Sequence, residues 1–66
     1  MMSLKRFRVI CEHHGARHIR TIVYREIIAL NEMDAVVKFM NWHEKEYPHR
    51  RAYNVECSVI ECFVVW

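Results

Sequence analysis

The stretch that decides the fold is NEMDAVVKFMNWHEKEYP, residues 31 to 48, which carries helix signals at both ends. Asn31 can cap the first backbone amides with its side-chain oxygen, and Glu32 and Asp34 suit the positive end of the helix dipole. Pro48 ends the segment because the residue before a proline avoids helical geometry. These signals predict one helix, with extended chain before and after it.

The predicted helix is apolar over a wide arc. With about 100° between successive residues, one apolar stripe that we expect to face the core comprises Met33, Val36, Val37, Met40 and Tyr47. His43 lies on the margin of this stripe, and an adjoining shoulder carries Ala35, Phe39 and Trp42. One sheet face does not need so much apolar surface. The shoulder therefore either covers the sheet edge or offers a surface to a partner.

Three segments outside the helix alternate in the manner of β-strands, namely residues 4 to 13, 17 to 29 and 52 to 65. The turn between the first two contains Gly15, the residue that most freely takes a left-handed conformation. The second strand is apolar on both faces and therefore needs cover on both. In the third strand the apolar face switches near Val59 and Ile60, which predicts a β-bulge or cover on both sides there.

The order strand, strand, helix, strand predicts a single α+β domain over residues 1 to 66. The simplest antiparallel arrangement places the first strand in the middle, in the order 2-1-3, with the helix across one face. The opposite face then carries Ile22, Tyr24, Ile60 and Val64, with Trp66 as a further candidate, and exposed apolar patches of this kind usually mark interfaces. A chain of 66 residues buries only ~60% of its unfolded surface. We therefore expect a homodimer, formed either by packing sheet on sheet or by joining long edge strands across a two-fold axis.

Enzymatic, cofactor and metal sites are hard to find in this sequence. With one glycine, the chain cannot form a phosphate-cradling glycine loop. A turn is surrounded by Cys11, His13, His14 and His18, but their spacing matches no zinc module. We expect no catalytic residue, no metal and no cofactor.

The cysteines and the hydropathy bear on location. The three cysteines, Cys11, Cys57 and Cys62, are an odd number, and Cys57 and Cys62 lie too far apart in one strand to bridge each other. No long apolar run or basic leader is present, so we expect neither a membrane span nor a signal peptide. Free thiols in the cytoplasm are the expectation.

Charge is distributed unevenly along the chain. Residues 1 to 25 carry a net +5 and the remainder a net −3. One sheet face can gather Arg6, Arg8 and Arg20 with Tyr24, a basic surface with a stacking aromatic of the kind that binds single-stranded nucleic acid. The alternative is a solvated face whose arginines pair with Glu12, Glu26 or Glu56 across strands. Nucleic-acid binding is therefore the second hypothesis for function.

The chain resembles the small strand-strand-helix-strand proteins encoded by phages and other mobile elements. The resemblance rests on the alternation of residues 7 to 11, the acidic helix start at residues 31 to 35, the Tyr47-Pro48 exit and the closing strand at residues 55 to 65. It implies a non-enzymatic accessory protein that acts by protein binding, for example an inhibitor of a host or defence protein. Aromatic residues with surplus exposure are the usual anchors of such contacts. We expect them to be Phe39, Trp42, Phe63 and Trp66.

Overall fold

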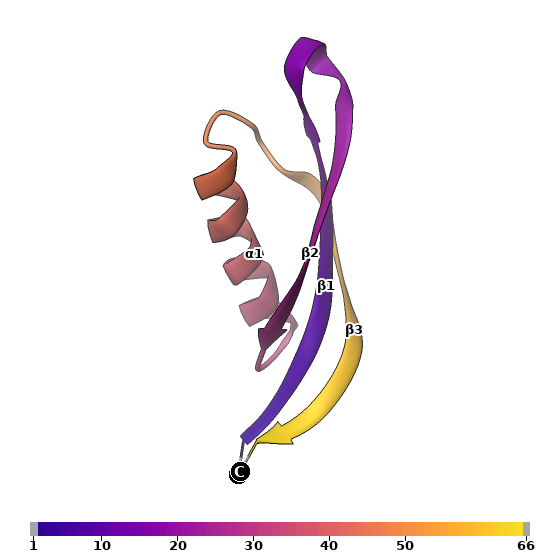
Figure 1. The fold of residues 1–66 in the computed structure, drawn as a ribbon, viewed down its shortest axis with the longest axis vertical. Coiled ribbons are helices and arrows are strands. Elements are labelled where there is room, and N and C mark those ends of the chain that lie inside the picture. Colours follow the sequence, from indigo (N-terminus) through magenta and orange to yellow (C-terminus); the bar gives the residue numbers. More distant parts are fainter. Residues whose placement is uncertain (1, 66) are drawn as a thin grey trace.

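A computed structural model describes residues 2–65 of the chain. Three antiparallel strands form one sheet in the order β2-β1-β3, and one helix packs on it (Figure 1). The elements are β1 (Met2–His14), a short 3₁₀ turn (Ala16–His18), β2 (Arg20–Ala29), α1 (Glu32–Glu46) and β3 (Tyr53–Val65). The predicted α+β class and strand order are confirmed.

The helix begins and ends where its signals predict. The Oδ1 of Asn31 accepts a hydrogen bond from the backbone N–H of Asp34 at 2.8 Å, which satisfies one of the free amides of the first turn. At the other end the backbone N–H of Tyr47 donates to the carbonyl of His43 at 2.8 Å. Within the described residues, no helix is long and apolar enough to cross a membrane.

The helix faces the sheet with the arc that we expected to be its shoulder. The buried apolar core comprises Phe7, Val9, Cys11, Ala29, Ala35 and Phe39. Met33, Val37 and Met40 of the expected core stripe instead point outward, with Met33 78% exposed and Val37 53% exposed, whereas Val36 and Tyr47 are half-buried. The prediction is wrong for the three exposed residues. Ala35 lets the helix backbone approach the sheet closely, and Phe39 fills the space one turn later, so this arc packs more tightly than the bulkier stripe.

A β-bulge lies where the third strand was expected to change its facing. Phe7 of β1 is opposite Val59 of β3, whereas the preceding Arg6 is opposite Glu61. Ile60 is therefore the additional residue, and the apolar alternation shifts by one position after it. The bulge prediction is confirmed.

The hairpin turn that joins β1 to β2 extends beyond the end of the helix in a molecule 48 Å long (Figure 1). Gly15 does not take the expected left-handed conformation, since its φ is −84°. Arg17 and His18 do, with φ of 60° and 59°. Gly15 provides space instead, because a Cβ there would lie 3.1 Å from Thr21 Oγ1 and 3.3 Å from Arg50 Nη1.

Candidate functional site

Two histidines from different elements meet inside the core. His13 extends the inward-facing row of β1 and is 1% exposed, and His43 lies on the inward arc of α1 and is 2% exposed. His13 Nδ1 and His43 Nε2 are 2.9 Å apart. The Tyr47 ring packs against both, with centroid distances of 4.7 and 5.1 Å. The sequence pattern placed His13 at the end of the first strand beside the turn and His43 on the margin of the helix stripe, and it did not predict that the two side chains are buried together.

The environment of this histidine pair favours its neutral form. In a neutral pair, one imidazole donates a hydrogen bond and the other accepts it. Burial lowers the pKa of His13, helped by the charges of Arg50 and His14. Burial also lowers the pKa of His43, with a smaller effect of His13. Within residues 2–65 no group of three His, Cys, Asp or Glu side chains is placed to hold a metal ion. The pair is therefore a buried polar contact that depends on pH.

The cysteine and histidine residues around the turn do not converge. Cys11 and His13 share the buried face of β1, but His14 and His18 are exposed. Burial, followed by the nearby charge of Glu12, raises the pKa of Cys11. Burial likewise raises the pKa of Cys57. A thiol with a raised pKa is a poor nucleophile at neutral pH.

The sheet face opposite α1, here called the open face, carries the arginines proposed for nucleic acid. Their ion pairs are Arg6 with Glu26 and Glu61, both at 3.8 Å, Arg8 with Glu26 at 3.6 Å, and Arg20 with Glu12 at 2.8 Å. The guanidinium of Arg8 also lies 5.7 Å from the centre of the Tyr24 ring. Such exposed pairs stabilise the fold by at most about 1 kcal/mol each. They nevertheless place a carboxylate beside every one of these arginines.

The outer strand β2 is apolar on both sides. On the open face its side chains are largely exposed, with Ile22 at 58% and Tyr24 at 61%. On the helix side Val23 and Ile27 pack at the margin of the core. Only one edge of β2 pairs with another strand of the described chain, namely β1. The other edge is open along most of its length.

The aromatic residues expected to bind a partner are only partly available. Phe39 is fully buried in the core, so its side chain offers no exposed surface to a partner. Trp42 is half-buried, with the guanidinium of Arg25 stacked 4.7 Å from its ring centre. Phe63 is half-buried on β3, and Trp66 lies outside the described residues.

Comparisons with known proteins do not add to this description. No protein-family model matches the chain, and neither curated proteins nor solved structures gave a match.

Proposed function

We propose that the chain is a non-catalytic protein-binding module that works as a homodimer, joined along the open edge of β2. The observation that carries this proposal is the ten-residue outer strand with exposed apolar side chains on one face and half-buried ones on the other. A long apolar edge strand is a template for pairing with another chain. Pairing two copies about a two-fold axis extends the sheet to six strands and covers the free edge of β2 in both copies at once, with β3 as the outermost strand on each side.

The sequence of β2 is self-complementary in one register. The two-fold axis of this register runs perpendicular to the sheet and passes between the Val23 residues of the two copies. Both helices then lie on the same side of the six-stranded sheet, and Val23 lies opposite its own copy. Arg20 then lies opposite the partner subunit's Glu26, and Ile22 lies opposite the partner subunit's Tyr24. Opposite-charge and aliphatic-aromatic pairs directly across strands each stabilise a sheet by about 0.2–1 kcal/mol. Every such pair occurs twice in the dimer.

Registers with the axis further along β2 are less favourable. An axis at Tyr24 places Glu26 opposite Ile22, which pairs a charge with an apolar side chain. An axis at Arg25 or Glu26 places two like charges opposite each other, which is destabilising.

The length of the free edge supports the same register. Near the end of β2, the carbonyl of Ile28 already accepts a hydrogen bond from Lys38 Nζ at 3.1 Å. Pairing about Val23 uses the strand from Ile19 to Ile27 and leaves Ile28 outside. Because this helix lysine occupies the last part of the strand edge, it limits how far pairing along β2 can extend.

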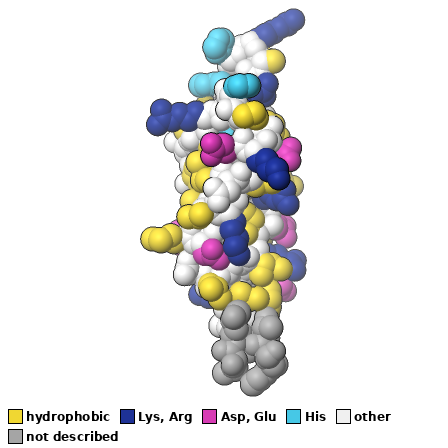
Figure 2. Space-filling model, turned by 90° about the vertical axis from the view of Figure 1, so that its left-hand side faces the viewer, with side chains coloured by type: hydrophobic (Ala, Val, Ile, Leu, Met, Phe, Trp, Pro, Cys, Tyr) yellow, Lys and Arg dark blue, Asp and Glu magenta, His cyan; other side chains and the backbone are white. Residues whose placement is uncertain are grey.

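Self-association through β2 leaves the outer face of α1 free for a second protein. Met33, Val37 and Met40 follow helical spacing and are exposed there, and Figure 2 shows hydrophobic side chains on this face of the molecule. Methionine adapts its shape readily and is frequent at binding surfaces. An accessory or inhibitory role in the cytoplasm fits such a surface. A location in the cytoplasm also fits the free thiols of Cys11, Cys57 and Cys62.

Light scattering coupled to size exclusion tests the dimer at micromolar protein concentration. We expect the wild-type chain to elute with twice the mass of one chain. Ile22→Lys should weaken the dimer roughly 30- to 150-fold, since burial of two exposed isoleucines at the interface stabilises it by about 2–3 kcal/mol. Val37→Lys is the matched control, because Val37 is similarly exposed but lies on the helix. A monomeric wild type, or equal effects of the two variants, contradicts the proposal.

A further inference from the structure

The end of the molecule that carries the hairpin turn is positively charged, and the charge comes from two segments that are distant in the sequence. The hairpin turn meets the connector between α1 and β3 there. A cavity of about 530 Å³ between them is lined by His14, His18, His49, Arg50, Arg51 and Tyr53, together with Gly15. With the neighbouring Arg17 of the turn, the histidines and arginines of this set are called the tip cluster. No aspartate or glutamate lines the cavity.

The arginines of the tip cluster differ from those of the open face in their partners. Among the residues that the structure describes, the ion pairs involve Arg6, Arg8, Arg20 and Lys38, and none involves Arg17, Arg50 or Arg51. In Figure 2, the histidine side chains lie at the upper end together with some of the Lys and Arg side chains, above the acidic side chains visible on that face, while other Lys and Arg side chains lie further down. The positive charge at the tip is therefore not neutralised within the described chain.

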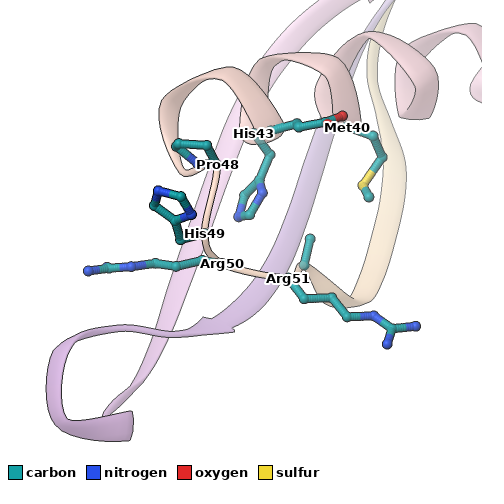
Figure 3. Close-up of a pocket in the computed structure, with 8 residues that line it drawn as sticks. Met40, His43, Pro48, His49, Arg50 and Arg51 are labelled. Atoms are coloured by element: carbon teal, nitrogen blue, oxygen red, sulfur yellow. The ribbon is translucent and has the colours of Figure 1, made fainter.

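The connector between α1 and β3 places its two arginines close to the hairpin turn. Figure 3 shows Arg50 and Arg51 extending in opposite directions from the connector, with Arg50 on the side of the hairpin turn. Arg50 Nη1 lies 3.3 Å from the position that a Cβ at Gly15 would occupy. A second cavity on the helix side of the connector includes Glu44. That carboxylate makes no ion pair within 4 Å with either arginine in the described residues.

The backbone of the turn supports a role for its side chains. Arg17 and His18 both have left-handed conformations, with φ of 60° and 59°. For residues other than glycine this conformation costs roughly 1–2 kcal/mol each, and Asn-Gly is the pair that suits two such positions in a hairpin. Arginine and histidine therefore stand where the fold itself favours other residues. Strained backbone of this kind occurs most often at functional sites.

We propose that the tip cluster binds the phosphodiester backbone of a nucleic acid. Guanidinium groups donate paired hydrogen bonds to phosphate oxygens, and imidazole N–H groups add single ones. Tyr53 offers an aromatic ring beside the cavity, packed at 5.3 Å from the His14 ring. Contacts of this kind are independent of base sequence and sensitive to salt. The proposal does not depend on the dimer, and it places nucleic acid at the tip in place of the open face.

Fluorescence anisotropy tests this with a fluorescein-labelled 20-nucleotide DNA strand and the corresponding duplex, using the full chain. If the three tip arginines each neutralise one phosphate, raising salt from 50 to 200 mM should weaken binding about 20-fold for the single strand and about 40-fold for the duplex. The two probes distinguish which form of the phosphate backbone is preferred. A labelled polyglutamate of the same length tests whether an acidic protein satisfies the cluster equally well.

Paired variants locate the site. Arg50→Gln combined with Arg51→Gln should weaken binding at 50 mM salt at least tenfold and reduce the slope of log K against log salt by about 1.4 to 1.8. Arg6→Gln combined with Arg8→Gln removes the same charge from the open face and should change the affinity less than about threefold. Circular dichroism confirms that each variant is folded.

The variant Arg17→Asn distinguishes an effect on DNA binding from an effect on stability. Asparagine tolerates the left-handed conformation, so this variant should unfold at a higher temperature than wild type while binding DNA more weakly. Three results would overturn the proposal: binding that is insensitive to salt, an equal or larger loss in the Arg6 and Arg8 variant, or polyglutamate binding as tight as that of DNA. Absence of DNA binding at 50 mM salt and 10 μM protein would overturn it as well.

Discussion

The buried histidine pair makes the stability of this fold depend on pH between about 5.5 and 7.5. The pKa of both His13 and His43 is lowered from the ordinary value of 6.5. Below pH 6.5 the unfolded chain therefore binds more protons than the folded chain. Stability is complete above this pH and is lost as the pH falls toward the folded-state pKa values. The groups around the pair reinforce this direction, because Arg50 and His14 also disfavour a positive charge on His13.

The magnitude follows from the linkage relation. A histidine that stays neutral in the folded state between about pH 7.5 and 5.5 reduces the free energy of unfolding by about 1.4 kcal/mol over that range. Two such histidines reduce it by about 2.7 kcal/mol, a large part of the ~5 kcal/mol that a small domain commonly has. One proton can be shared, since a protonated imidazole still donates to its neutral partner. The observed loss should therefore not exceed about 2.7 kcal/mol.

Urea denaturation followed by circular dichroism measures this loss at fixed protein concentration across the same pH range. His43→Gln removes one titrating group and should bring the loss to about 1.4 kcal/mol or less. His49→Gln, on the exposed connector, should leave the wild-type loss unchanged. The reasoning is refuted if wild-type stability rises on acidification, or if His49→Gln lowers the pH dependence as much as His43→Gln does.

Two further predictions concern the helix. Phe39→Ala should reduce the free energy of unfolding by about 3–5 kcal/mol because the Phe39 side chain is fully buried. Met33→Ala should change the free energy of unfolding by less than about 0.5 kcal/mol, since Met33 is 78% exposed. Urea titration compares the two variants, and similar losses would contradict the observed helix orientation. Asn31→Ala should cost about 0.5–2 kcal/mol through loss of the bond to Asp34, while Asn31→Asp should retain most of the stability; an unchanged midpoint in the alanine variant would contradict the cap.

Local signals in the sequence predicted the elements of this fold well. The Asn31 cap and Pro48 bound the helix because capping and the restriction before proline act within one turn of the chain. The bulge at Ile60 was visible because a change of alternation is itself a local pattern. The inward arc of the helix was not predictable in the same way. Two adjoining arcs are apolar, and the choice between them depends on how closely Ala35 lets the helix approach a sheet formed from distant residues.

The candidate sites depend on contacts that periodicity does not report. The pairing of His13 with His43 joins residues from two elements, and histidine is read as polar when it stands alone. One signal was present, since His13 continues the odd-numbered inward row of Phe7, Val9 and Cys11. The tip cluster was missed for a similar reason. Its two segments, residues 14 to 18 and 49 to 51, meet only because the hairpin extends past the helix to the level of the connector.

Disulfide trapping tests the central claim, the β2 homodimer, most directly. In a Cys62→Ser background, Ile22→Cys combined with Tyr24→Cys should give a covalent dimer on mild oxidation, because each new thiol lies opposite the other across the two-fold axis at Val23. Either substitution alone should stay monomeric on a non-reducing gel, since directly opposite residues in an antiparallel pair lie within bridging distance and more distant ones do not. If the double variant stays monomeric, or a single variant crosslinks as fast as the double one, the proposed interface is wrong.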